Sequence, residues 1–303
     1  MRPARSLLIY TGIVFLGGAL LAPWLYWTFQ WLAALLPAFR KLADNPFHRY
    51  VNRSLLALAL TGLWPLLRSL GVRGWQDVGL AKPTGQWRRL AAGFALGFAS
   101  LACVAGIALA AGARGVNPEV SSGRWIGTVA GAALTAAIVA VVEEILFRGA
   151  IFGALRRTCR WPIALLISSG IYALVHFFSK PRSPDEINWA SGLALLPAML
   201  RGFIDPEQVV PGFFNLTLAG ALLALAYQRT GNLYFSIGLH AGWIFWLKSA
   251  GLLTREVAGA NVWFWGTGKL IDGWLATGVL SLALGSLWKL LPPERNTEIS
   301  TVR

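Results

Sequence analysis

Acidic residues are scarce in this chain: 13 of its 303 residues are Asp or Glu, against 27 Lys and Arg. All five aspartates and six of the glutamates lie in polar connecting segments. The exceptions are Glu143 and Glu144, adjacent to one another within the apolar stretch 125–157. A carboxylate in hydrocarbon costs at least about 2.5 kcal/mol, so this pair is a functional-site hypothesis from the start.

Other chemistries lack the residues they would need. No apolar stretch contains an aspartate, which excludes an aspartyl intramembrane protease. Ser168-Ser169-Gly170 lacks the leading glycine of a G-x-S-G serine motif, and the chain has no H-E-x-x-H sequence for a zinc-protease helix. Only two cysteines are present, Cys103 and Cys159, too few for a disulfide framework or a cysteine metal cluster.

What the chain has in abundance is apolar surface. It is 56% hydrophobic and 13% charged, with a mean hydropathy of +0.57, which is typical of a multi-pass integral membrane protein. The net charge of +14 would indicate a nucleic-acid partner in a soluble protein. Here the Lys and Arg fall mainly between apolar runs, where they set topology and contact anionic lipids. We therefore expect membrane lipids and no nucleic acid as partners, in a bacterial-type cell (inner) membrane.

The apolar runs predict an all-α polytopic fold of about eight transmembrane helices around an intramembrane polar cavity, because a bilayer is spanned by about 20 helical residues. The first run should be broken near Pro23. A local excess of Lys and Arg before the third run and after the fourth favours an N-terminus inside the cell. The expected spans are 6–36, 51–70, 88–112, 125–157, 161–179, 209–228, 233–252 and 271–291.

We divide the chain into N-terminal transmembrane helices (1–124), a catalytic helical core (125–250), and a last helix with a polar tail (251–303). The segment 180–208 within the core is the longest polar connection. Its moderately apolar middle predicts an interfacial or re-entrant helix that either serves as a lid or is simply a surface helix.

Helix geometry assigns different roles to the two glutamates. Glu144 and Arg148 are four residues apart and share a helix face, so they can pair. Glu143 points about 100° away from Glu144 and has no such local partner. The prediction is a neutralised structural pair at Glu144 and Arg148, with Glu143 as the reactive carboxylate.

Two of the three histidines, His176 and His240, also lie in apolar runs. Together with Glu143 they supply a base and polarising donors, although each alone would more often be a packing element. They are predicted at unequal depths, so their convergence requires tilted or staggered helices. The G-x-x-x-G spacings at 238–242 and 149–153 would allow close approach of helices; 93–97 shares this weak pattern.

These motifs resemble the family of CAAX-protease and bacteriocin-processing intramembrane endopeptidases. The resemblance covers roughly 125–250 and rests on three ordered motifs: E-E-x-x-x-R from Glu143 to Arg148, an aromatic-x-x-x-His from Tyr172 to His176, and a third motif containing His240. It implies an eight-helix membrane core without a cofactor. Its substrate would be a membrane-embedded or lipid-anchored protein.

The resemblance also implies residue roles. Glu143 with His176 would activate a water, His240 would stabilise the oxyanion, and Glu144 and Arg148 would support the site. The second motif usually begins with Phe, where this chain has Tyr172. The third usually has Asn four residues after its histidine, where this chain has Ile244, so an oxyanion donor is missing. Asn215 and the indole of Trp243 are candidate substitutes.

Two alternatives stay open. The chain could be a non-catalytic membrane protein with an immunity, scaffold or transport role, a hypothesis that Ile244 favours. It could instead be a zinc-dependent membrane protease, because two histidines and one glutamate form a known catalytic zinc ligand set. The favoured site contains no metal.

Overall fold

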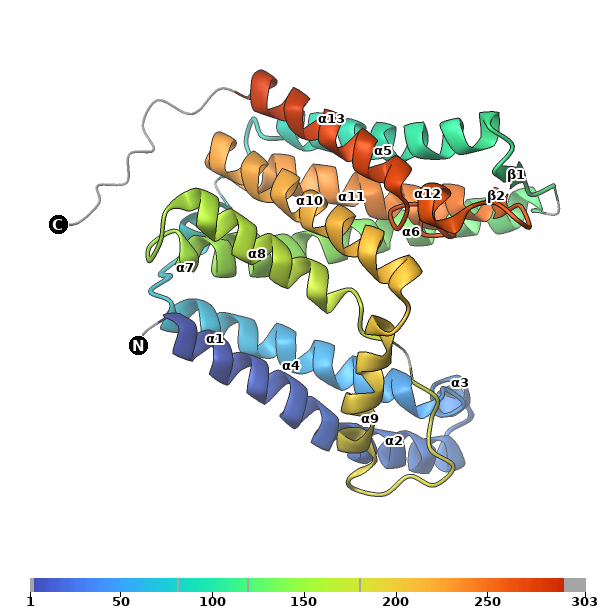
Figure 1. Ribbon diagram of the computed structural model, residues 1–303. Coiled ribbons are helices and arrows are strands. Elements are labelled where there is room, and N and C mark those ends of the chain that lie inside the picture. The colour runs from blue at the N-terminus through green and yellow to red at the C-terminus, as the bar shows by residue number, and fades with distance from the viewer. Residues whose placement is uncertain (1–2, 81, 119, 180, 292–303) are drawn as a thin grey trace. The chain divides into compact units, whose positions relative to one another are not determined.

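The computed structural model describes residues 3–80, 82–118, 120–179 and 181–291 (Figure 1). The chain forms two compact units. Unit 1 comprises Met1–Arg73 and Phe177–Ile204, and unit 2 comprises Gly74–His176 and Asp205–Arg303. The units divide the chain differently from the expected domains: 74–124 joins the predicted core, and most of the lid-like segment joins the N-terminal helices. The predicted polar tail, 292–303, lies outside the described residues.

Unit 1 is a set of helices. A long helical stretch opens it, and the middle of the segment between residues 180 and 208 forms a helix as predicted. Its elements are α1 (Pro3–Gly12), the π-helix η1 (Ile13–Gly17), α2 (Gly18–Leu35), η2 (Pro37–Phe39), α3 (Arg40–Ala43), α4 (Phe47–Ser69), α9 (Ser191–Met199) and η5 (Leu200–Phe203).

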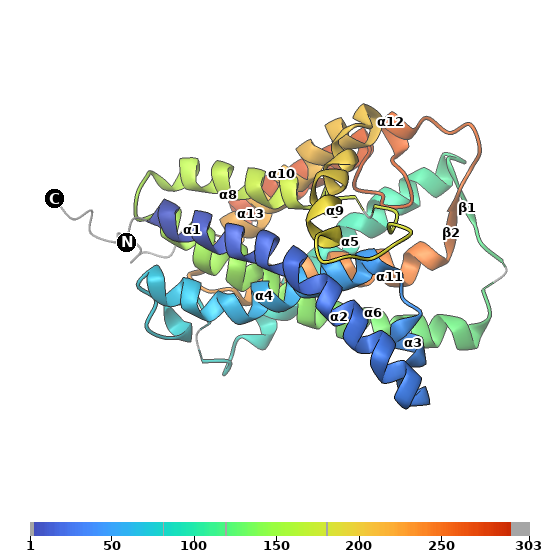
Figure 2. The ribbon, with the colours of Figure 1, turned by 90° about the horizontal axis from the view of Figure 1, so that it is seen from below.

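The predicted break near Pro23 is wrong. Pro23 lies inside α2, and Figure 2 shows α1 and α2 as one continuous rod. Proline cannot donate a hydrogen bond to the carbonyl four residues earlier, which is that of Ala19. Gly192 of α9 packs against this carbonyl so closely that a Cβ would overlap the oxygen. The helix continues through Pro23, and α9 covers the carbonyl of Ala19, which lacks its usual hydrogen bond.

Unit 2 contains the remaining elements. They are η3 (Trp75–Val78), α5 (Trp87–Ala110), β1 (Arg114–Val116), α6 (Ser122–Glu144), the π-helix η4 (Ile145–Phe152), α7 (Gly153–Leu155), α8 (Trp161–Val175), α10 (Pro206–Thr230), α11 (Tyr234–Ser249), η6 (Ala250–Leu252), β2 (Thr254–Glu256), α12 (Val262–Trp265) and α13 (Trp274–Leu290). The strands β1 and β2 pair antiparallel, with Arg114 opposite Glu256.

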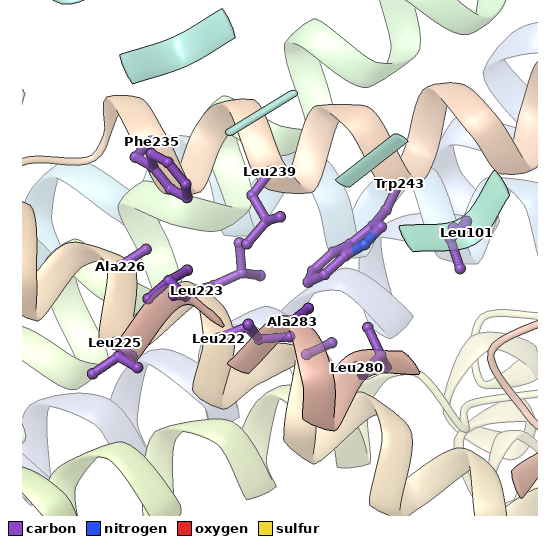
Figure 3. Close-up of a cluster of buried hydrophobic side chains, with 12 residues drawn as sticks. Leu101, Leu222, Leu223, Leu225, Ala226, Phe235, Leu239, Trp243, Leu280 and Ala283 are labelled. Carbon is purple, nitrogen blue, oxygen red and sulfur yellow. The ribbon is translucent and has the colours of Figure 1, made fainter. Parts of the chain in front are cut away.

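The apolar core of unit 2 is formed by α10, α11 and α13, with Leu101 from α5. In Figure 3, Leu239 and Trp243 project from α11 toward Leu222 of α10 and Ala283 of α13. Such a core fixes the rotation of α11 about its own axis. It thereby determines which way the neighbouring face of α11, which carries His240, is turned.

Helices α5 and α11 meet through reciprocal glycine contacts. A Cβ on Gly93 or Gly97 of α5 would overlap a backbone carbonyl oxygen of α11, and a Cβ on Gly238 or Gly242 of α11 would overlap one of α5. The G-x-x-x-G spacings at 93–97 and 238–242 therefore pack against one another, which allows the two backbones to touch. Gly149 also makes a close contact, with Val78, whereas a Cβ on Gly153 would meet only the carbonyl of Arg148 at 3.6 Å.

The protein is an all-α polytopic membrane protein apart from its short strand pair. Within the described residues, four helical stretches are long and apolar enough to cross a membrane: Arg5–Leu35, Trp87–Ala110, Trp125–Leu155 and Val209–Thr230. Shorter apolar helices cover Trp161–Val175, Ser191–Phe203 and Trp274–Leu290. All eight predicted spans are largely helical, although the fifth ends at Val175 rather than at residue 179.

The glycine contacts predict opposite effects for one substitution at two positions of α5. Gly97→Ala should destabilise the protein by about 1–3 kcal/mol, because the new methyl group collides with the backbone of α11. Gly106→Ala is the matched control, since a Cβ there meets nothing within 4 Å. It should be neutral or stabilise by up to about 1 kcal/mol through helix propensity. Unfolding in mixed detergent micelles measures both, and equal effects would contradict the proposed packing.

Candidate active site

The two glutamates end α6, and the π-helix η4 begins at the next residue. π-Helical turns inside α-helices are rare and are frequent at functional sites. The two side chains lie in different environments: Glu144 is fully buried, whereas Glu143 is 27% exposed. Adjacent residues on one helix therefore present one carboxylate to the protein interior and the other to a partly open position.

Glu144 binds two partners through a single oxygen. Its Oε1 accepts hydrogen bonds from Arg148 Nη1–H at 3.0 Å and from His240 Nδ1–H at 2.9 Å. The predicted pairing of Glu144 with Arg148 is thus confirmed. The bond to His240 was not predicted, and it places a proton of the imidazole ring on Nδ1, because a carboxylate only accepts.

Arg148 is buried and links three helical segments. Besides pairing with Glu144, its Nη2–H donates to the carbonyl of Gly220 in α10 at 3.3 Å. Its guanidinium also lies over the ring of Tyr172 in α8, 4.5 Å from the ring centroid. A guanidinium with these contacts neutralises Glu144 and joins η4 to α8 and α10.

Glu143 has no such close partner. Its Oε2 lies 3.7 Å from His240 Nε2, which is beyond hydrogen-bond distance. That oxygen is buried and forms no hydrogen bond with any described residue. The prediction that Glu143 lacks the partner that Glu144 has is confirmed. Its carboxylate remains available to accept a proton from a bound molecule.

His176 stands at the end of α8 rather than within it. Its ring Nδ1–H donates to the carbonyl of Tyr172 at 2.7 Å, which leaves Nε2 as the acceptor. The ring packs against that of Tyr172, with the centroids 4.5 Å apart. Glu143 and His240 are both close enough to act on it electrostatically. His176 is exposed, as a residue that receives substrate or water must be.

The structure therefore brings together Glu143, Glu144, Arg148, Tyr172 and His240, with His176 beside Tyr172. These residues come together although they were predicted at unequal depths in the membrane. Both chain segments change their structure at the site: α6 changes to a π-helix after Glu144, and α8 ends just before His176. The described residues include no group of three or more His, Cys, Asp or Glu arranged to hold a metal ion.

The predicted substitute donors are engaged elsewhere. The amide of Asn215 donates to the carbonyls of Ile271 and Gly273 at 2.7 and 2.8 Å, and its oxygen accepts from Thr277. Asn215 thus fastens α10 to the start of α13 and does not join the cluster.

The indole N–H of Trp243 is also in use, because it donates to Ser100 Oγ at 2.9 Å. Ile244, one turn after His240, has no polar side-chain atom. Neither residue on this part of α11 offers a free donor.

An apolar cavity lies between the helices that carry Glu143 and His240 and their neighbour α5. It has a volume of about 630 Å³, and its lining includes Leu90, Phe94, Ala137, Val141, Ile237 and Ala241. We predicted a polar cavity, whereas this one is lined almost entirely by apolar side chains. It is suited to hydrocarbon or to an apolar peptide segment.

Two features of the site were missed at the level of sequence. Residues 145–152 have the composition of an ordinary apolar helix, so the π-helix left no signal. The hydroxyl of Tyr172 lies 3.3 Å from His240 Nε2. The sequence gives one signal for this contact, because Tyr172 stands where the motif usually has Phe. It does not identify His240 as the partner of the hydroxyl, since His240 lies on a distant part of the chain.

Comparison with known proteins agrees with this geometry. Residues 125–246 match the family model described as "Type II CAAX prenyl endopeptidase Rce1-like". The matched segment is similar to that family and contains Glu143, Glu144, Arg148, Tyr172, His176 and His240.

A relative from Bacillus subtilis (strain 168), "Uncharacterized protein YyaK", is 26% identical over 207 residues. The match covers 66% of this chain and 60% of the length of that protein. No solved structure matches the chain.

The contacts of Glu144 predict strong coupling with Arg148. Arg148→Met should destabilise the protein by about 3–5 kcal/mol, because it leaves a buried carboxylate without its cation. Adding Glu144→Gln should recover part of this loss, since a neutral amide needs no counter-charge. Arg88→Met, at an exposed position, should change stability by no more than about 0.5 kcal/mol. A double-mutant cycle measured by detergent unfolding tests the coupling, and strictly additive effects would contradict it.

Proposed function

We propose that this protein is an intramembrane endopeptidase that hydrolyses a peptide bond of a membrane-embedded or lipid-anchored protein with a glutamate-activated water. The observation that carries the proposal is the difference between the two glutamates. Glu144 is fully buried and neutralised by Arg148, whereas Glu143 is 27% exposed and forms no ion pair within hydrogen-bond distance. A carboxylate held in this state beside imidazoles is suited to general-base catalysis.

In the proposed reaction, Glu143 and His176 hold a water molecule and Glu143 takes one of its protons. The water oxygen forms a bond to the carbonyl carbon of the substrate, and the electron pair of the carbonyl moves onto its oxygen. His240, protonated on both ring nitrogens, donates its Nε2–H to the resulting oxyanion while Glu144 holds its Nδ1–H. When the intermediate collapses, the carbon–nitrogen bond breaks and Glu143 returns its proton to the leaving amine.

The remaining residues hold this arrangement. Glu144 accepts the Nδ1–H of His240 and so orients its Nε2 toward Glu143. Second partners of this kind set the tautomer and direction of a histidine ring. Arg148 supplies the counter-charge of Glu144 in the interior. None of these steps requires a cofactor.

The substrate class follows from the surroundings. The apolar cavity between α5, α6 and α11 would receive a hydrocarbon chain or an apolar helix of the substrate. Lys and Arg outnumber Asp and Glu by 27 to 13, which favours contact with anionic lipids. We therefore infer that the partners are lipids and a membrane-bound peptide or protein, in a cell membrane of bacterial type.

A non-catalytic role is the second candidate, and Ile244 favours it because this residue offers no oxyanion donor. It predicts that the carboxylate of Glu143 is dispensable. Rescue of a deletion phenotype by the Glu143→Gln variant would support this candidate over the enzyme. The zinc-dependent candidate predicts stoichiometric zinc in the purified protein and loss of cleavage with chelators.

Glu143→Gln should abolish cleavage, since an amide of the same shape cannot accept the proton of water. The expected loss in kcat is at least about 100-fold, which is the lower range for a general base. The measurement first compares the new peptide termini in membranes of cells that carry wild type or the variant. These termini define the cleavage site, and a quenched fluorescent peptide that spans this site then serves as the substrate for kinetic assays.

The matched control is Glu256→Gln, which removes an exposed carboxylate in β2, outside the candidate site and outside the segment 180–208. It should leave cleavage unchanged. Both variants should unfold at the same detergent concentration as wild type. Wild-type cleavage by a folded Glu143→Gln protein would refute the assignment of Glu143 as the base.

A further inference from the structure

Tyr172 occupies the centre of the cluster. Its side chain is buried, with 3% of its surface exposed. Its ring lies under the Arg148 guanidinium and packs edge-on against Phe147, 5.1 Å between centroids. These contacts hold the aromatic ring in one orientation. The hydroxyl is therefore directed at a defined point, beside Nε2 of His240.

The site lacks a second donor for an oxyanion. His240 is followed one turn later by Ile244, and the N–H groups of Asn215 and Trp243 are bonded to Ile271, Gly273 and Ser100. Sites that stabilise an oxyanion generally use more than one preorganised donor, each about 2.7–3.1 Å from it. Within the described part of the site, the hydroxyl of Tyr172 is the neutral side-chain donor that faces His240.

We propose that the Tyr172 hydroxyl is the second oxyanion donor and performs the task that Ile244 cannot. This inference rests on the proposed function. The hydroxyl oxygen and His240 Nε2 are 3.3 Å apart, so an oxygen atom can lie within hydrogen-bond distance of both. At rest His240 Nε2–H donates to the Tyr172 oxygen; during the reaction this N–H and the Tyr172 O–H both donate to the substrate oxygen.

The resting hydrogen bond is weak enough to be exchanged. Hydrogen bonds between nitrogen and oxygen are usually about 2.9–3.0 Å long, so the 3.3 Å separation between His240 Nε2 and the Tyr172 oxygen is long. A negatively charged oxygen is a much stronger acceptor than the oxygen of a neutral phenol. The oxyanion therefore attracts the hydroxyl hydrogen as its charge develops.

Arg148 makes this hydroxyl a better donor. Its guanidinium carbon lies 4.5 Å from the centroid of the Tyr172 ring, in the geometry of a cation–π contact. A cation on the ring face withdraws electron density from the phenol and polarises its O–H bond. In a buried setting this polarisation is weakly screened. Arg148 thus serves both Glu144 and Tyr172.

The test is a double-mutant cycle of Tyr172→Phe and Ile244→Asn, assayed with the quenched fluorescent peptide whose cleavage depends on Glu143. Tyr172→Phe keeps the ring and removes only the hydroxyl. It should lower kcat about 100-fold, as expected for loss of one oxyanion donor, with KM changed less than about three-fold. Ile244→Asn should change the wild-type rate little, because both donor positions are already served.

The decisive measurement is the double variant. Ile244 and His240 share a helix face, so an Asn at position 244 can supply the missing donor. Ile244→Asn should raise the kcat of the Tyr172→Phe protein at least about ten-fold, a rescue that a merely structural role of the hydroxyl would not give. Tyr227→Phe, a buried tyrosine that packs on Phe152 outside the site, is the control and should leave kcat unchanged.

The outcomes separate this inference from the function on which it rests. Unchanged kcat in a folded Tyr172→Phe protein would overturn the role of the hydroxyl and leave the endopeptidase proposal standing. So would a loss that Ile244→Asn fails to repair. If cleavage never depends on Glu143, both proposals are wrong.

Discussion

The site depends on one oxygen atom, Oε1 of Glu144, which accepts hydrogen bonds from Arg148 and His240 in a fully buried position. Neither water nor counter-ions can compensate an ionised group there, so the protein must supply both partners itself. Arg148 comes from the turn that follows, and His240 comes from a helix nearly a hundred residues later. The pairing therefore joins α6 to α11, and through Arg148 and the Gly220 carbonyl it also joins α10.

This constraint explains why two adjacent carboxylates can differ so much. Because Arg148 pairs with Glu144, it does not pair with Glu143. Successive helical side chains point about 100° apart, so Glu143 is turned toward a more open position. Tyr172 lies between the buried pair of Glu144 and Arg148 and the two histidines. Its ring is held by Arg148, its carbonyl accepts from His176, and its hydroxyl faces His240.

Much of this architecture could be predicted from residue spacing. The apolar runs located the helices, and the four-residue interval located the pair of Glu144 and Arg148, because both follow from the helical period. What could not be predicted involves contacts between distant segments. The engagement of Asn215 with α13 and the approach of Tyr172 to His240 depend on helix rotation, which core packing sets. The predicted break at Pro23 was wrong because the carbonyl of Ala19, which proline leaves unpaired, is covered by Gly192, a residue far along the chain.

The contact of α5 with α11 has a consequence for how a peptide reaches Glu143. Because glycines let the two backbones touch, no layer of side chains between them can compress or rotate. These helices should move as a single rigid body that carries His240. A peptide that reaches Glu143 would then have to approach beside this body rather than between α5 and α11.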